Sequence, residues 1–167
     1  MKAAIRDNNP VIFAEDRMTY NLSGPVPAGD HLVPLGKADI KRQGADLTLI
    51  TISRMVHTAL AAAETLAEKS IDAEVVDLRC LAPLDMETVL TSVKKTGRAL
   101  VLDGAHLSFG ITGEIAASIG EAAFDYLDAP VMRLAGPDHP VPYSPALEQF
   151  SVPGTDQAVA KVDEMLG

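Results

Sequence analysis

The stretch LGKADIKRQGADLTLITISRMVHTALAAA, residues 35–63, decides the fold class of this 167-residue chain. Its centre, residues 47–52 (LTLITI), is a short apolar run rich in β-branched residues, which is typical of a buried strand. Apolar side chains then recur at helical spacing from residue 54, and Ser53 offers an N-cap. A buried strand followed directly by an amphipathic helix predicts an α/β fold with parallel strands.

The same strand-then-helix unit recurs along the rest of the chain. Further strands are expected at residues 73–78, 98–102 and 130–134, and further helices at residues 86–95, 111–124 and 155–165. Pro83 and Asp85 set up the start of the second helix, and Gly97 is placed to end it. Residues 38–41 add one more strand. The prediction is a three-layer α/β/α domain over residues 32–167, with a mostly parallel five-stranded sheet.

The first 31 residues do not fit this domain. Residues 10–14 (PVIFA) have the composition of a buried strand, but no helix follows to return the chain. Residues 21–30 (NLSGPVPAGD) are rich in Pro and Gly, which indicates a linker. We expect residues 1–31 to be the remnant of a preceding domain plus its linker.

Composition excludes several classes of protein. The net charge of −9 and the absence of a basic stripe argue against a nucleic-acid partner, because phosphate contacts need clustered Lys and Arg. The single Cys80 excludes an internal disulfide and a CxxC pair. No apolar run reaches the roughly 18–20 residues that cross a bilayer. The start, MKAAIRDNNP, is too polar for a signal peptide, so we expect a cytoplasmic protein without a membrane partner.

Polar residues follow each expected strand, where ligands gather in open α/β sheets. These candidates are Ser53, Arg54, His57, Asp77, Arg79, Asp103, His106, Asp138 and His139. One interpretation is a shared polar site with two acid–base histidines. The other is a set of helix caps, loop hydrogen bonds and contacts between subunits. We favour the second, because strand ends carry such residues in any fold of this class.

Other chemical motifs are weak. The four histidines (His31, His57, His106 and His139) show no HxH or HExxH spacing, so we predict no transition-metal site. Glycines 104, 110 and 113 precede a helix without the pattern of a phosphate-binding loop, which favours a structural turn. Cys80 stands before an apolar run and is interpreted as a buried thiol.

One helix face carries only small side chains, namely Gly113, Ala116, Ala117 and Gly120. Small residues allow another backbone to come close. Two interpretations stay open: close seating on the domain's own sheet, or an interface between subunits.

Several longer runs together resemble one family. They are IRDNNPVIFAEDRMTY (5–20), LGKADIKRQGADLTLIT (35–51), VVDLRCLAPLD (75–85), GEIAASI (113–119) and GPDHPVPYSPALE (136–148). In the family's order, and over essentially the whole chain, they resemble the beta subunit of the thiamine-diphosphate-dependent component of 2-oxo acid dehydrogenase complexes. Pyruvate, branched-chain 2-oxo acid and acetoin dehydrogenases share these runs, and transketolase-like enzymes share them more loosely.

The resemblance implies how the chain divides into domains and which part of the enzyme carries the catalytic residues. Residues 32–167 would be the transketolase C-terminal domain, and residues 1–31 the last strand of the pyrimidine-binding domain plus its linker. The parent enzyme decarboxylates a 2-oxo acid and passes the acyl group to lipoamide, using thiamine diphosphate and magnesium. Its beta-subunit catalytic Glu lies upstream of this segment. The resemblance therefore implies no catalytic and no cofactor-binding residue in this chain, and an inactive isolated chain.

The resemblance also implies partners. They are the alpha subunit, a second beta subunit and the dihydrolipoyl acyltransferase core, and the C-terminal domain has an assembly role. The interface candidates are Gly113, Ala117, Gly120, Asp138, His139, Pro142 and Tyr143. Ala4, Asp7 and Asn9 match part of a monovalent-cation site that holds potassium in some relatives; alternatively, Asp7 and Asn9 only form a turn before Pro10.

One departure leaves the substrate open. Many relatives carry His-Glu-Ala after the strand that is expected here at residues 98–102, where this chain reads LDGAH at residues 102–106. Pyruvate, branched-chain acids and acetoin therefore all stay candidates. The alternative function is a free-standing regulatory or protein-interaction domain without catalytic activity. The expected strand at residues 10–14 argues against it, because a stand-alone domain has no reason to keep such a strand.

Overall fold

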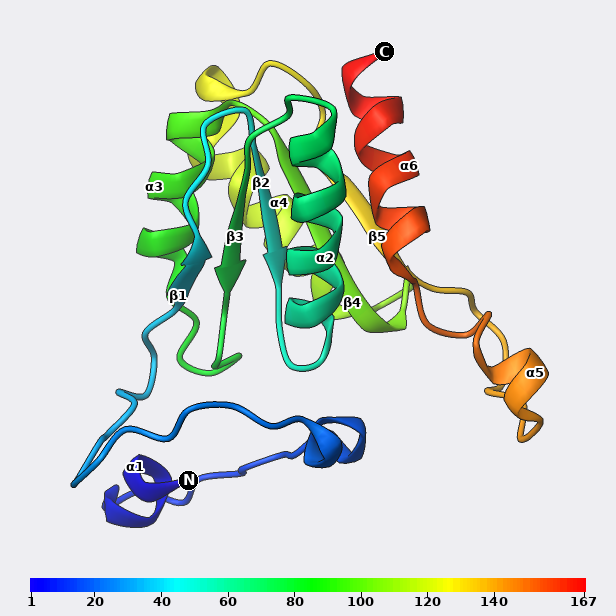
Figure 1. Ribbon diagram of the computed structural model, residues 1–167. Coiled ribbons are helices and arrows are strands. Elements are labelled where there is room, and N and C mark those ends of the chain that lie inside the picture. Colours follow the sequence, from blue (N-terminus) through cyan, green and yellow to red (C-terminus); the bar gives the residue numbers. More distant parts are fainter.

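The computed structural model describes all 167 residues and contains one five-stranded sheet (Figure 1). Its strands are β1 (Asp39–Arg42), β2 (Leu47–Thr51), β3 (Ala73–Asp77), β4 (Ala99–His106) and β5 (Met132–Gly136). They lie in the order β1-β3-β2-β4-β5. The edge strand β1 runs antiparallel to β3, and the other three pairings are parallel. The mostly parallel five-stranded sheet is thereby confirmed.

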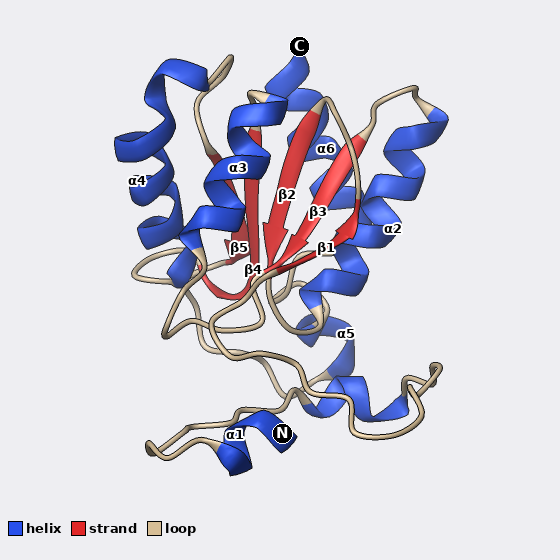
Figure 2. Cartoon of the chain, turned by 90° about the vertical axis from the view of Figure 1, so that its left-hand side faces the viewer, coloured by secondary structure: helices blue, strands red, loops and turns tan.

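Helices cover both faces of the sheet. The helices are α1 (Lys2–Arg6), α2 (Met55–Glu68), α3 (Met86–Thr96), α4 (Ile111–Ala123), α5 (Pro145–Glu148) and α6 (Thr155–Leu166), with 3-10 turns η1 (Arg17–Asn21) and η2 (Phe124–Tyr126). Figure 2 shows α2 and α6 on one face and α3 and α4 on the other. This confirms the three-layer α/β/α architecture.

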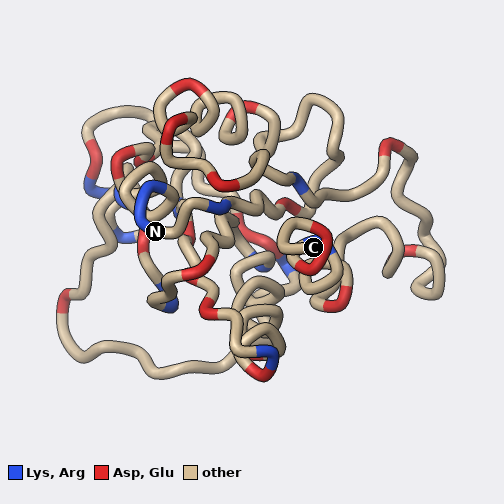
Figure 3. Tube along the Cα trace, turned by 90° about the horizontal axis from the view of Figure 1, so that it is seen from above, with Lys and Arg blue, Asp and Glu red and all other residues tan.

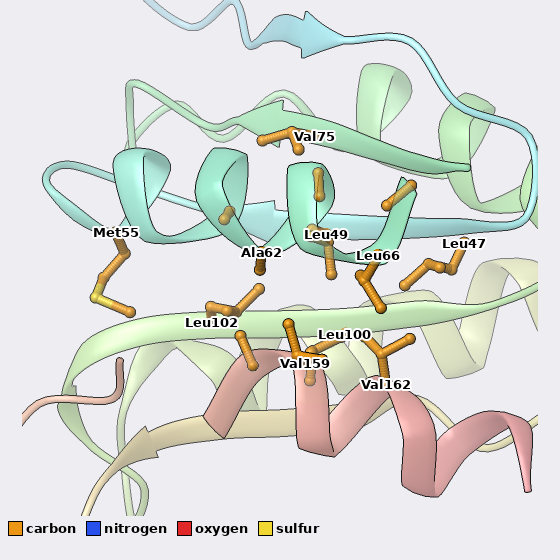
Figure 4. Packing of buried hydrophobic residues seen from close by; sticks show 14 residues of the cluster. Leu47, Leu49, Met55, Ala62, Leu66, Val75, Leu100, Leu102, Val159 and Val162 are labelled. Atoms are coloured by element: carbon orange, nitrogen blue, oxygen red, sulfur yellow. The ribbon is translucent and has the colours of Figure 1, made fainter. Parts of the chain in front are cut away.

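The alternation of side chains along β2 builds two separate cores. Leu47 and Leu49 pack with α2 and α6 (Figure 4). Ile50 packs on the other face with α3 and α4. All five residues of β2 are buried. A central strand covered on both faces explains why its sequence is a continuous apolar run rather than an alternating one.

The helix ends agree with the sequence signals at α3 but not at α2. The Asp85 side chain accepts the Thr88 N–H at 3.3 Å, and Gly97 ends α3 with φ +70°. At α2, Arg54 takes the N-cap position and Ser53 has φ +60°. The predicted N-cap role of Ser53 is wrong, because Ser53 forms the left-handed turn out of β2 and the N-cap position falls one residue later, on Arg54, without a side-chain cap bond.

Residues 1–31 contain α1 and η1 but no strand. The strand predicted at residues 10–14 is wrong in this chain, where Ile12 is 98% exposed and Phe13 is 48% exposed. The reason is that no strand of the sheet pairs with this segment, which passes outside the carboxyl ends of the strands (Figure 1). Its assignment as a remnant of a preceding domain plus a linker stays a prediction.

A buried polar network joins α3 to the sheet near the amino ends of β2 and β3. The Glu74 carboxylate is fully buried and accepts hydrogen bonds from the Ser92 hydroxyl and the Lys95 ammonium. The Thr48 hydroxyl lies 2.7 Å from Ser92 Oγ and 2.8 Å from Thr96 Oγ1. Buried polar groups that are hydrogen-bonded in this way fix how a helix sits on a sheet.

Candidate functional site

The polar candidates after the strands meet at one edge of the sheet, since β2 to β5 are parallel. The structure divides them into separate groups rather than a single shared site. One group lies where β3 ends beside β1, one lies between the ends of β4 and β5, and the residues after β2 belong to neither.

The group beside β1 is an ion-pair network. Asp39 Oδ2 lies 2.5 Å from Arg79 Nη2 and 2.7 Å from Lys41 Nζ, and Asp77 Oδ2 lies 3.7 Å from Lys41 Nζ. The hydrogen bond from Lys41 lowers the pKa of Asp39, whereas burial raises the pKa of Asp77. Asp39 and Asp77 face each other across the two strands, so Lys41 and Arg79 hold the edge strand in place.

The second group lines a shallow cleft between the β4–α4 turn and the start of the loop after β5. The cleft is formed by His106, Ser108, Phe109, Asp138, His139 and Pro140. Asp138 accepts hydrogen bonds from the Ser108 hydroxyl and from the Ser108 N–H, the latter at 3.1 Å. The side-chain bond from Ser108 is the main reason that the pKa of Asp138 is lowered.

The cleft lacks the geometry of a nucleophile and its base. The Ser108 hydroxyl donates to the Asp138 carboxylate and not to an imidazole, and the lowered pKa of Asp138 makes this carboxylate a weak base. His139 Nδ1 lies 3.1 Å from the Pro140 carbonyl oxygen, which can only accept, so Nδ1 carries a proton. The Ser108–Asp138 bonds join two loops and the His139–Pro140 contact lies within one, which favours the interpretation as loop contacts over a shared acid–base site.

The remaining candidates lie apart from the cleft. Arg54 Nε is 3.5 Å from Asp16 Oδ2 and thereby ties the amino-terminal segment to the start of α2. Ser53 and His57 are exposed and do not line the cleft. Asp103 accepts the adjacent Gly104 N–H at 2.8 Å, and partial burial raises the pKa of its carboxyl group.

Of the three glycines expected to form a structural turn, Gly110 shows a structural requirement. A Cβ on Gly110 would lie 2.2 Å from the His106 carbonyl oxygen, so only glycine allows the turn to close this tightly. Cys80 is half-buried, and its sulfur accepts the Gly36 N–H at 3.3 Å.

No three His, Cys, Asp or Glu side chains gather in a way that could hold a metal ion. In the proposed potassium segment, Ala4 lies within α1. Asp7 Oδ1 accepts both the backbone N–H and the side-chain amide of Asn9 at 2.9 Å, and the backbone bond lowers the pKa of Asp7. The observed contacts are those of a turn, and the cation site stays a prediction.

The small-residue face of α4 is turned away from the sheet. The helix seats itself through Thr112, Ile115, Ile119 and Ala123, which are all buried. A Cβ on Gly120 would meet nothing within 4 Å, and one on Gly113 would meet only Arg133 Nη1 at 3.5 Å. Seating of this face on the domain's own sheet is therefore wrong, and its role as an interface remains open.

All seven aromatic residues are exposed, which the sequence analysis missed. They are Phe13, Tyr20, Phe109, Phe124, Tyr126, Tyr143 and Phe150, with between 48% and 109% of their surface accessible. The sequence held a signal for five of them, Tyr20, Phe109, Tyr126, Tyr143 and Phe150, which lie outside every expected strand and helix, whereas Phe13 and Phe124 fall within expected elements. Exposed aromatic side chains are enriched at contacts between proteins.

Two further properties of the surface are the distribution of its charges and the hydropathy of its helices. Figure 3 shows Lys and Arg scattered among more numerous Asp and Glu, without a basic stripe. None of the helices combines the length and the apolar character that crossing a bilayer requires.

Comparison with known proteins gives a family and several relatives. Residues 36–157 match the family model described as transketolase, C-terminal domain. The chain is 47% identical over 165 residues to the acetoin:2,6-dichlorophenolindophenol oxidoreductase subunit beta of Bacillus subtilis, covering 99% of this chain and 48% of that protein. It is 45% identical over 163 residues to the mitochondrial pyruvate dehydrogenase E1 component subunit beta-1 of Arabidopsis thaliana, covering 95% and 45%.

A third relative is the 2-oxoisovalerate dehydrogenase subunit beta of Bacillus subtilis, 45% identical over 167 residues, covering 99% of this chain and 51% of that protein. The chain thus spans about half the length of the curated relatives it matches.

A solved structure agrees with the fold. A split-gene transketolase, described as an inactive beta4 tetramer, superposes with a TM-score of 0.72 at 25% identity, covering 86% of this chain and 45% of that one. The family model spans the strands β1 to β5 and the helices on both faces of the sheet. The chain therefore belongs to the transketolase C-terminal domain family.

Proposed function

We propose that this chain is the C-terminal, assembly-forming part of the beta subunit of a thiamine-diphosphate-dependent 2-oxo acid or acetoin dehydrogenase. The observation that carries the proposal is the match to beta subunits of three such enzymes over 95% to 99% of this chain, at 45% to 47% identity. In the parent enzyme a 2-oxo acid is decarboxylated and its acyl group passes to lipoamide.

The residues of this chain do not fit thiamine diphosphate by themselves. The cofactor's diphosphate is held through a magnesium ion, which carboxylates bind, and no group of three His, Cys, Asp or Glu side chains gathers in this chain. The carboxyl-edge cleft holds its one carboxylate, Asp138, in a bond to Ser108. We assign this chain no chemical step, and the cofactor and magnesium belong to the parent enzyme.

Two surfaces support an assembly role. The first is the outward face of α4, with Gly113, Ala117 and Gly120, where a partner can approach the backbone closely. The second is the loop after β5, with Asp138, His139, Pro142 and Tyr143, most of which are exposed. The proposed partners for these surfaces are the alpha subunit, a second beta subunit and the dihydrolipoyl acyltransferase core.

Two further parts of the proposal concern the location of the protein in the cell and an ion that it binds. We propose that the protein is located in the cytoplasm. We also propose that Ala4, Asp7 and Asn9 contribute to a potassium site once the rest of the beta subunit supplies the other ligands.

The test captures the native protein from its source cells with an antibody raised against this chain. Mass spectrometry of the captured material should show a beta subunit well above 17.6 kDa together with an alpha subunit. The captured complex should reduce an artificial electron acceptor with one of pyruvate, a branched-chain 2-oxo acid or acetoin, and only when thiamine diphosphate and magnesium are present.

The same capture distinguishes the alternative. A protein of 17.6 kDa without an alpha subunit and without activity would instead be a free-standing regulatory or interaction domain. As a control, the capture is repeated from cells grown with and without acetoin, because cells can restrict the synthesis of an enzyme to conditions in which its substrate is present.

A further inference from the structure

Residues 7–29, here called the strap, pass outside the carboxyl ends of the strands (Figure 1), and none of them is buried. The strap is closed on itself at its base, because the Arg6 guanidinium donates to both carboxylate oxygens of Asp30, at 2.7 and 3.3 Å. Its large apolar side chains stay exposed, among them Ile12 at 98% and Met18 at 63%. The strap therefore rests beside the domain without packing into either core.

A single ion pair connects residues 1–31 to the rest of the chain. Asp16 Oδ2 lies 3.5 Å from Arg54 Nε, and no other hydrogen bond or ion pair joins the two parts. The strap fixes its own half of the pair, because Asp16 Oδ1 accepts the Met18 N–H at 2.9 Å and the Asp16 carbonyl accepts the Thr19 hydroxyl at 2.7 Å. The domain fixes the other half, because Arg54 is the N-cap residue of α2.

The pair is open to solvent and is therefore easily broken. The side chains of Arg54 and Asp16 are 33% and 25% exposed. Ion pairs with this exposure add little stability, and salt shortens their range from about 8 Å at physiological ionic strength to about 3 Å at 1 M. Breaking the pair costs the domain no buried contact, because both cores lie within residues 47–165.

We infer that the Asp16–Arg54 pair is a latch that holds the strap across the carboxyl edge of the sheet. Opening the latch frees the strap, while Arg6 and Asp30 keep its two ends together. In the beta subunit proposed above, the strap leads from the preceding domain into this one, so the latch controls how firmly the two domains are held together. That consequence rests on the proposed function, whereas the latch itself does not.

Trypsin cleavage after Arg17, the residue next to the latch, measures how often the strap is free, because cleavage follows the population of the open form when opening is fast. Mass spectrometry gives the cleavage rate, which is divided by the rate for a peptide of residues 12–22 at the same salt concentration. Arg54→Met should raise this relative rate about two- to fivefold. A concentration of 1 M NaCl should raise it similarly in the wild type but not in Arg54→Met. Arg54→Lys keeps the charge and should stay close to the wild type.

Arg98→Met is the matched control. Arg98 Nη2 also lies 3.5 Å from a carboxylate oxygen, Asp128 Oδ2, and its side chain is 32% exposed, but this pair lies at the amino end of β4. The control variant should be cleaved after Arg17 at the wild-type rate, and circular dichroism checks that every variant keeps its helices.

Three results would overturn the latch. They are a wild-type rate in Arg54→Met, an equal rise in Arg98→Met, and a salt effect that persists in Arg54→Met. Each of them leaves the proposed function intact, because that function is tested separately by capture of the native complex.

Discussion

At the scale of single residues, one carboxylate of the domain is fully buried. Glu74 sits in β3 with no exposed surface, and its partners are the Ser92 hydroxyl, the Lys95 ammonium and, at 3.3 Å, the Gly44 N–H. A buried charge is tolerated only while such partners neutralise and bond it.

Lys95→Met should therefore destabilise the domain by about 2 kcal/mol, because it leaves the Glu74 carboxylate buried without a cation. Urea denaturation followed by circular dichroism measures the free energy of unfolding. Lys94→Met is the matched control: Lys94 only lies over the exposed Tyr126 ring, so its loss should change stability by no more than about 0.5 kcal/mol. Equal effects of the two substitutions would refute the role of the Glu74–Lys95 pair.

Asp77 gives a pH dependence with a defined sign. Burial raises its pKa in the folded state, so the folded protein takes up a proton more readily than the unfolded chain. The charged carboxylate is a net cost near neutral pH, and this cost disappears as pH falls through the raised pKa. Asp77→Asn should therefore be more stable than the wild type at pH 7, and the difference should shrink towards pH 4. A difference that stays constant over this range would contradict the assignment.

At the scale of elements, the same substitution should have opposite signs in two helices. Gly97 ends α3 with φ +70°, and a Cβ there would lie 2.6 Å from an Asp128 carboxylate oxygen. Gly120 lies inside α4, where a Cβ meets nothing within 4 Å. Gly97→Ala should lower the free energy of unfolding by about 1–2 kcal/mol, and Gly120→Ala should raise it by about 0.5–1 kcal/mol. Thermal denaturation of both variants tests this, and a shift of the same sign in both would contradict it.

The helices and strands of the domain were predictable because each buries one apolar face against its neighbours. The strand at residues 47–52 and the helix at residues 86–95 differ from β2 and α3 by a residue or less at each end. β4 continues to His106, beyond the predicted end at residue 102, because its last residues pair with Gly136 across an irregularity. Such pairings between distant segments leave no local pattern.

Other features could not be read from the sequence. Residues 10–14 are apolar, but a strand needs a neighbour to bond with, and the sheet of this chain offers none. The Glu74–Lys95 pair joins residues 21 positions apart, and Glu74 stands in a segment that reads as an ordinary strand. For the cleft, the candidates His106, Asp138 and His139 were identified, but not the Ser108–Asp138 bond that occupies the carboxylate.

At the scale of the whole molecule, the division of labour between domains leads to a test of cofactor binding. We have assigned the cofactor and its magnesium to the rest of the enzyme, so the isolated chain should show no stoichiometric binding of thiamine diphosphate with magnesium in isothermal titration calorimetry. The native complex, captured as described above, is the positive control. One-to-one binding by the isolated chain would overturn the proposal that cofactor binding belongs to the rest of the enzyme.

The placement of every aromatic side chain outside the core has a spectroscopic consequence. The chain has no Trp, and Tyr20, Tyr126 and Tyr143 are already in contact with water in the folded state. Unfolding therefore moves no fluorophore from an apolar environment into solvent, and tyrosine emission should change little across the denaturation transition. A partner that covers Tyr143 removes water from its ring instead, so the intrinsic emission of this protein should report docking rather than folding.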